Sequence, residues 1–149
     1  MILIRSAEPG DEKDILFLIK ELAVYEKEPD AVENTADDIR SHLFDERICE
    51  AIVAVQKNEI IGFALYYNSY STWKGKCLYL EDLYVKPEMR RSGVGKMLFE
   101  KIVDLACLKK VRRMEWQVYD WNQPAINFYI KCKAKLNKEW MNGRIEFDH

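Results

Sequence analysis

Residues 81–96 of this 149-residue chain read EDLYVKPEMRRSGVGK, a stretch that joins a strand to a helix. Aromatic and β-branched residues end at Val85, and apolar residues recur at helical spacing from Val94 onward. The loop between them carries basic side chains and glycine. Because the first amides of a helix lack acceptors and the helix dipole adds positive charge there, the stretch predicts an anion-binding site. Glu81 and Asp82 precede the loop on the strand, so a candidate base lies close to that site in the sequence.

Patterns on either side of this stretch predict an α+β fold with a mixed, mostly antiparallel sheet flanked by helices. Short turns separate the middle strands, which is typical of an antiparallel meander. Gly62, inside a strand, predicts a bulge or a close backbone contact. We find no linker or repeat and predict a single domain over residues 1–149. The predicted strands cover residues 2–6, 51–55, 60–67, 77–85, 114–119, 135–140 and 144–147, and the predicted helices begin near residues 14, 36, 94 and 123.

Composition narrows the possible partners. A net charge of −2 makes the chain as a whole a poor match for nucleic acid, and the basic run at residues 109–113 fits a solvated helix end. No apolar run reaches the length of a membrane span, so we expect a cytoplasmic protein with no membrane partner. The four cysteines are widely spaced and only two histidines are present. We therefore expect reduced thiols and no metal site.

The glycine loop differs from two common phosphate-binding motifs. A P-loop requires Ser or Thr where Met97 stands, and a dinucleotide fingerprint requires a third glycine where Leu98 stands. The remaining pattern, Arg-x-x-Gly-x-Gly over residues 90–95, fits an anion site, but it also fits a strand-to-helix turn that needs glycine only for its backbone angles. The flanking sequence has to decide between the two.

Four flanking blocks are informative: IKELAVYE at residues 19–26, YSTWKG at 70–75, LYLEDLYV at 78–85 and DWNQPAINFY at 120–129. With the glycine loop, they resemble the Gcn5-related N-acetyltransferase (GNAT) superfamily. The resemblance is strongest to its diamine branch, which holds the spermidine/spermine N1-acetyltransferases and their thialysine-preferring relatives. It extends in patches over almost the whole chain. The resemblance implies a GNAT fold and acetyl-CoA as co-substrate.

The resemblance also implies direct attack of a substrate amine on the thioester, with no acyl-enzyme. A free alkyl amine has a pKa near ~10, so a base has to remove its proton at neutral pH. By resemblance Glu81 is this base and Tyr129 is the acid that protonates the leaving thiolate. Taken alone, Glu81 also fits a surface ion pair and Tyr129 a core position on an amphipathic helix. Asp82 faces the opposite side of an ideal strand, so both carboxylates reach one substrate only if a bulge turns the backbone.

By the same resemblance, the coenzyme is held by the end of the acidic strand, by the glycine loop and by the last helix. Exposed backbone of the strand would bind the pantetheine amides. Asn122 is the expected side-chain contact there, although it also fits a helix N-cap. The predicted coenzyme residues are Leu83, Tyr84, Val85, Arg90, Arg91, Ser92, Gly93, Val94, Gly95, Lys96, Asn122 and Tyr129.

The predicted amine site is acidic and aromatic. It comprises Tyr25, Glu26, Trp73, Glu81 and Asp82, which match positions lining the amine site of the diamine branch. Trp73 fits a cation–π contact with the substrate, worth roughly 0.5–2 kcal/mol, and equally a hydrophobic plug in a turn.

Two segments of the chain bear on how closely it follows the pattern of the family. Lys133 replaces a helix-ending glycine of the family, so either the cap differs or Lys133 adopts a left-handed conformation. The segment at residues 139–145 resembles the thialysine relatives more than the polyamine enzymes.

Family members are commonly homodimers, and we expect the same here. The alternatives to a small-amine enzyme are a protein lysine or N-terminal acetyltransferase and a non-catalytic acyl-CoA sensor.

Overall fold

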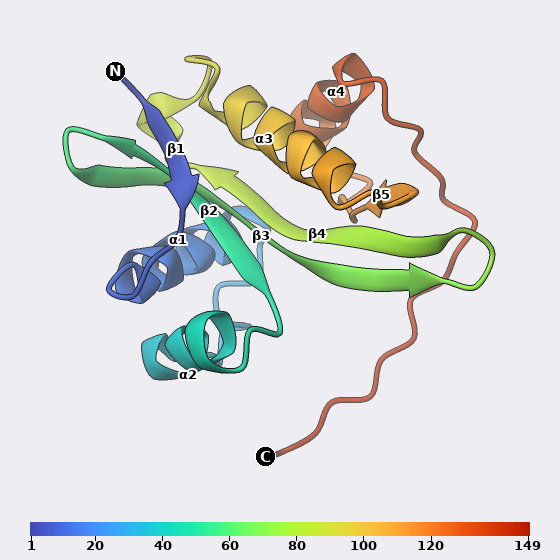
Figure 1. Cartoon of the computed structure of the whole chain (residues 1–149), viewed down its shortest axis with the longest axis horizontal. Coiled ribbons are helices and arrows are strands. Elements are labelled where there is room, and N and C mark those ends of the chain that lie inside the picture. The colour runs from blue at the N-terminus through green and yellow to red at the C-terminus, as the bar shows by residue number, and fades with distance from the viewer. The chain divides into compact units, whose positions relative to one another are not determined.

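The computed structural model describes all 149 residues, whose contacts separate into two compact units, Met1–Trp116 and Gln117–His149. The first unit holds the sheet and most of the helices, and the second holds one helix (Figure 1). The elements are β1 (Leu3–Ser6), α1 (Glu12–Tyr25), α2 (Ala36–Arg40), the π-helical turn η1 (Ser41–Asp45), β2 (Glu50–Gln56), β3 (Glu59–Ser71), β4 (Gly75–Val85), the 3₁₀ turn η2 (Pro87–Met89), α3 (Val94–Leu108), β5 (Arg113–Glu115) and α4 (Gln123–Lys131).

The sheet has five strands in the order β1-β2-β3-β4-β5. The first four strands pair antiparallel, and β5 adds to β4 in parallel after the α3 crossover. Lys57 and Asn58 both have positive φ in the turn that joins β2 to β3, as the twist of a tight hairpin demands. The predicted mixed, mostly antiparallel sheet is confirmed.

Helices cover both faces of this sheet, with α1 and α2 on one face and α3 on the other (Figure 1). On the first face, Phe63 and Tyr84 pack with Ile15 and Leu18 of α1 in one apolar cluster. Successive strand residues point to opposite faces, so the neighbours of Phe63 face α3. The side chains of α3 that pack there are fully or nearly fully buried: Val94, Leu98, Phe99, Ile102 and Ala106.

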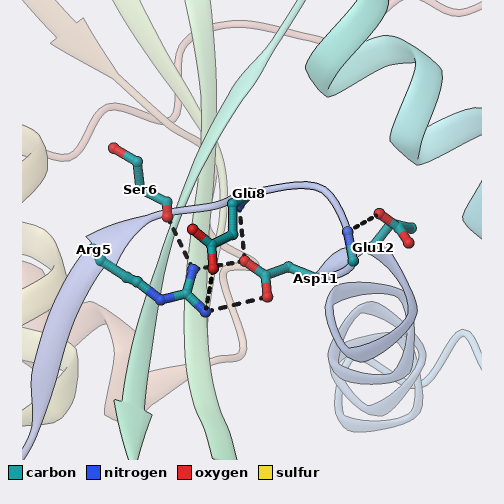
Figure 2. Close-up of polar contacts among 6 residues, drawn as sticks. Arg5, Ser6, Glu8, Asp11 and Glu12 are labelled. Carbon is teal, nitrogen blue, oxygen red and sulfur yellow. Dashed lines mark hydrogen bonds and ion pairs between the residues drawn. The ribbon is translucent and has the colours of Figure 1, made fainter. Parts of the chain in front are cut away.

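A polar network ties the end of β1 to the start of α1 (Figure 2). Arg5 donates two hydrogen bonds to the Asp11 carboxylate, at 2.7 and 3.2 Å, and Asp11 also accepts from the Glu8 amide at 2.9 Å. Glu12 accepts from the Gly10 amide at 2.8 Å. The charged pair is bidentate and partly buried, which is the geometry that makes such pairs strong. It fixes where α1 enters the domain, and so where the other end of α1 lies.

Gly62 marks both a bulge and a close contact, as predicted. The pairing of β2 with β3 shifts register between Ala54 and Val55, next to Gly62. A Cβ atom added to Gly62 would lie 3.0 Å from the Tyr84 carbonyl oxygen and 3.3 Å from the Leu98 Cδ1 atom. Only glycine lets β3 approach β4 and α3 this closely.

The chain after Glu115 corrects three of the predicted strands. Residues 132–149 form no helix or strand, so the strands predicted at 135–140 and 144–147 are wrong, and β5 ends at Glu115 rather than at residue 119. Those strands were predicted on either side of the turn-prone pair Asn142-Gly143, but a strand is stable only beside a partner that pairs with its backbone. No ladder forms there, and Trp140, Met141, Ile145 and Phe147 are 77–96% exposed. None of the helices combines the length and apolar character of a membrane span.

Candidate active site

A β-bulge in β4 brings two adjacent carboxylates to one face of the sheet. Asp82 pairs with Leu65, and Leu80 pairs with the very next residue of β3, so Glu81 is an extra residue without a cross-strand partner. Asp82 therefore faces the α1 side together with Leu65, and Glu81 accepts a hydrogen bond from the Tyr67 hydroxyl on that side at 3.5 Å. The structure therefore contains the bulge that allows the carboxylates of Glu81 and Asp82 to reach the same substrate.

Two tyrosines that the sequence did not single out stand beside these carboxylates. Tyr67 and Tyr79 are cross-strand partners whose rings lie 5.3 Å apart at an interplanar angle of 30°. Burial and the charge of Glu81 raise the pKa of the Tyr67 hydroxyl, and the same causes raise that of Tyr79 to about 12. Both hydroxyls therefore stay protonated, and so neutral, at physiological pH. In the sequence, Tyr67 and Tyr79 alternate with apolar residues of their strands, which was the only sign that they belong to this face. That alternation does not reveal which side chains of two strands lie next to each other.

The carboxylates share a strongly negative environment with Glu26, the residue that caps the end of α1. Burial, and after it the charges of Glu81 and Glu26, raise the pKa of Asp82 to about 7. Burial and the charge of Glu81 also raise the pKa of Glu26. A cation near this group would relieve the mutual repulsion of the three carboxylates. We call Glu26, Glu81 and Asp82, together with Tyr67 and Tyr79, the acidic cluster.

The two aromatic residues predicted for the amine site lie in different places. Tyr25 is the last residue of α1 and directly precedes Glu26 of the acidic cluster. Trp73 lies in the turn between β3 and β4 and is 88% exposed. It lies past the end of β3, whose last residue, Ser71, is four residues or about 13 Å along the strand from Tyr67. A single chain therefore does not bring Trp73 to the acidic cluster.

The glycine loop has the geometry of an anion site. Gly93 precedes α3 with φ +86°, and the first hydrogen bond of the helix runs from the Met97 amide to the Gly93 carbonyl at 3.0 Å. The amides of Val94, Gly95 and Lys96 thus have no acceptor within the helix. Ser92 donates its hydroxyl to the Met89 carbonyl, which closes the loop.

Comparison with known proteins identifies the family in which an acidic strand and a glycine loop of this kind occur together. The sequence matches the acetyltransferase (GNAT) family over residues 16–133. The chain belongs to this family. It is 39% identical over 143 residues to the thialysine N-epsilon-acetyltransferase of Bos taurus, an alignment covering 90% of this chain and 84% of that one. It is 38% identical over 139 residues to the Homo sapiens spermidine/spermine N(1)-acetyltransferase-like protein 1, covering 88% of this chain and 20% of that protein.

Solved structures agree on the fold. A possible acetyltransferase from Clostridium difficile 630 superposes with a TM-score of 0.80 at 24% identity, covering 99% of each chain. The resemblance to the GNAT superfamily and its diamine branch is thus confirmed, and the chain is an N-acetyltransferase that uses acetyl-CoA as its co-substrate.

The donors present in the acetyltransferase fit this co-substrate. Three helix amides without helical acceptors converge at the start of α3, and the side chains of Arg91 and Lys96 beside them are exposed. A Cβ atom added to Gly93 would meet nothing within 4 Å, so there is open space at the residue that precedes these amides. Amides at a helix N-terminus together with cations suit a pyrophosphate.

The strand that leads into the loop has an edge without a strand partner, which is the feature expected for binding of the pantetheine arm. The ladder between β4 and β5 ends where Tyr79 pairs with Glu115. Beyond that point, Leu83, Tyr84 and Val85 pair with β3 alone. The diverging edge of β4 is the feature that the prediction for these three residues needs.

Asn122 and Tyr129 of the acetyltransferase lie in its second unit. Asn122 is buried at the N-cap of α4, where its side chain accepts from the Ala125 amide at 3.3 Å. Tyr129 is buried too, and its ring meets that of Phe128 edge-on at 5.2 Å. Asn122 thus forms the helix N-cap, and Tyr129 occupies the buried helix position, that were the structural alternatives for these residues. The contact of Asn122 with the coenzyme and the proton transfer from Tyr129 to the thiolate stay predictions.

Lys133 occupies the position after α4 where the family has a helix-ending glycine. Its φ is +67°, its amide bonds to the Ile130 carbonyl at 2.9 Å, and the Ala134 amide bonds to the Tyr129 carbonyl at 3.1 Å. These are the two hydrogen bonds of a Schellman motif. The cap is kept, and lysine adopts the left-handed conformation at a cost of about 1 kcal/mol.

Proposed function

We propose that this acetyltransferase transfers the acetyl group of acetyl-CoA to a primary amine of a small cationic substrate: a thialysine-like amino acid, a diamine or a polyamine. Attack is direct, in a ternary complex. The acidic cluster is the observation that carries the proposal, because three carboxylates and two aromatic rings next to a coenzyme loop suit a substrate with more than one positive charge. The identity of 39% to a thialysine acetyltransferase supports the same substrate class.

In the proposed mechanism, Glu81 accepts the proton of the bound ammonium, directly or through one water, and so frees the nitrogen lone pair. Asp82, Glu26 and Tyr25 hold the other charged part of the substrate. Acetyl-CoA, when bound, supplies an acyl group activated as a thioester. The nitrogen forms its bond to the acetyl carbon, and Tyr129 donates its phenolic proton to the sulfur as the C–S bond breaks. The nitrogen releases a second proton as the amide forms, and this proton restores the phenol. The ammonium thus loses two protons, one to Glu81 and one that balances the proton gained by the thiol.

For the coenzyme, we propose that the amides of residues 93–96 hold the pyrophosphate and that Arg90, Arg91 and Lys96 add positive charge. The backbone of residues 83–85 and the Asn122 side chain hold the pantetheine arm. A contact between Trp73 and the amine substrate is supported only by the family resemblance.

We further propose that residues 1–149 act as one acetyltransferase domain, cytoplasmic and homodimeric. The proposed reaction needs no metal ion, and we expect neither nucleic acid nor membrane as a partner.

A panel of amines tests this function. The chain is incubated with acetyl-CoA and, one at a time, thialysine, lysine, ornithine, putrescine, spermidine, spermine and a lysine-containing peptide, and release of free thiol is followed. We expect the highest kcat/KM for one of the small dications or polycations. Faster turnover of the peptide would favour a protein acetyltransferase. Coenzyme binding without turnover of any amine would favour an acyl-CoA sensor.

A further inference from the structure

We propose that Arg90 couples the two substrates: by holding the glycine loop against the end of α1, it makes coenzyme binding strengthen amine binding. The inference rests on the proposed function, because it assigns the loop to the coenzyme and the end of α1 to the amine. Arg90 acts here as a positioning residue, through Tyr25.

The side chain of Arg90 is held between the loop and α1 by three contacts. Its guanidinium carbon lies 5.1 Å from the centre of the Tyr25 ring and 5.3 Å from that of the Tyr84 ring. Its Nε–H donates to the Val85 carbonyl at 3.2 Å. A guanidinium within about 6 Å of an aromatic face is attracted by the ring quadrupole, and its planar shape suits such stacking.

The same contacts reach the acidic cluster. The Tyr84 hydroxyl donates to the Glu21 carboxylate of α1 at 3.1 Å, so β4 and α1 are joined beneath Arg90. Tyr25 is followed directly by Glu26, whose pKa responds to the charge of Glu81. A shift of Tyr25 therefore changes the position of a carboxylate in the acidic cluster.

Arg90 also belongs to the coenzyme loop, three residues before the helix-capping Gly93. The chain between them is compact, because Arg91 has a positive φ of 67° and Ser92 is bonded back to Met89. A pyrophosphate on the amides that follow Gly93 restrains this loop and, with it, Arg90. Once Arg90 is restrained, Tyr25 and Glu26 lose less freedom when the amine binds, which is a positive coupling. Linkage requires that the amine strengthens coenzyme binding by the same factor.

Calorimetry on the intact chain measures this factor. CoA, which carries no acetyl group to transfer, is titrated with and without saturating thialysine, or with the best amine of the panel above if that is another one. Thialysine is titrated with and without CoA. We expect each ligand to tighten the Kd of the other by about fivefold or more, the range typical of coupled sites.

Variants separate coupling from charge. Arg90→Gln and Arg91→Gln each remove one cation from the loop, so both should weaken CoA binding. Only Arg90→Gln should reduce the coupling factor to between about onefold and twofold, since it is Arg90 whose guanidinium contacts the rings of Tyr25 and Tyr84. Tyr25→Leu removes the ring of α1 that Arg90 contacts, keeps the charge of the loop, and should reduce the factor to the same range.

The outcomes bear on the two proposals differently. A wild-type chain that binds CoA and the amine with no coupling, or an Arg90→Gln variant that keeps the wild-type factor, overturns the role of Arg90 and leaves the proposed function standing. A chain that turns over no amine overturns the proposed function, and the coupling with it. Equal loss of the factor in Arg90→Gln and Arg91→Gln would assign the effect to net charge, which also overturns the role of Arg90.

Discussion

Glu81 and Asp82 are neighbours in the chain, yet both side chains lie on the α1 face of the sheet, because Glu81 is the extra residue of a bulge in β4. In a regular strand one of the two would face α3. The bulge also forces the two charges close together, which is one reason why the pKa of Asp82 rises to about 7. The site therefore combines an exposed carboxylate suited to a base with a second one whose charge depends on the ligand.

Replacing Glu81 by Gln keeps the shape of the base and removes its ability to take a proton. We expect kcat/KM on the best amine to fall by about 10²–10⁴ at neutral pH. The matched control is Glu46→Gln, since Glu46 is an exposed carboxylate after η1 and should leave the rate unchanged. Unchanged activity of Glu81→Gln would show that Glu81 is not the base.

Tyr67→Phe deletes the hydroxyl that lies 3.5 Å from Glu81 Oε1 but keeps the ring that packs against that of Tyr79. A hydrogen bond of this kind is worth about 0.5–1.5 kcal/mol, so kcat should fall roughly twofold to tenfold while the KM for acetyl-CoA stays constant. The exposed Tyr70 provides the control variant Tyr70→Phe. An effect on the KM for acetyl-CoA alone would contradict a role of Tyr67 beside the base.

Tyr129→Phe removes the proposed proton donor to the thiolate. We expect kcat to fall by at least about tenfold and the Kd of CoA to change little. Tyr119→Phe, an exposed tyrosine of the same unit, is the control. If Tyr129→Phe weakens CoA binding and leaves kcat intact, the residue is a packing or binding residue and not the acid.

The raised pKa of Asp82 makes a prediction about stability that requires no substrate. The folded carboxyl keeps its proton up to about pH 7, whereas the unfolded one loses it near pH 4, so its favourable contribution is complete below pH 4 and lost as the pH rises to 7. Relative to wild type, Asp82→Asn should therefore gain unfolding free energy between pH 4 and pH 7, by at most about 1.4 kcal/mol per pH unit. Urea unfolding at several pH values measures the difference.

The control for that series is Asp104→Asn, an exposed aspartate on α3. Its difference from wild type should be flat over the same pH range. A flat Asp82→Asn series would contradict the raised pKa.

Gly62→Ala tests the close approach of β3 to β4 and α3. The added Cβ would lie 3.0 Å from the backbone oxygen of Tyr84, which cannot move without shifting β4. We expect a loss of about 1–3 kcal/mol in unfolding free energy. In Gly143→Ala the added Cβ meets nothing within 4 Å, so that change should stay within about 0.5 kcal/mol. Equal stability of the two variants would contradict the contact.

Local features were predictable because their causes lie within a few residues. Thr35 caps α2 by accepting from the Asp38 amide, and Gly93 precedes α3 in a left-handed conformation. The turn at Lys57 and Asn58 sets the hairpin register. The C-terminal strands were predicted wrongly for the complementary reason: a turn-prone pair such as Asn142-Gly143 indicates where two strands could be joined, but not whether their backbones find partners.

The sequence by itself determined the family, the coenzyme loop and the acidic strand before it, since spacing along one segment suffices to place helix amides, glycines and carboxylates near one another. Only the tertiary structure decided which face Glu81 and Asp82 share, that Tyr67 and Tyr79 stand beside them, and that Arg90 reaches Tyr25 across the fold. It also left Trp73 far from the cluster. The physical reason is register: pairing between strands, and the packing of α1 on them, sets these contacts, and a one-residue bulge changes which side chains meet.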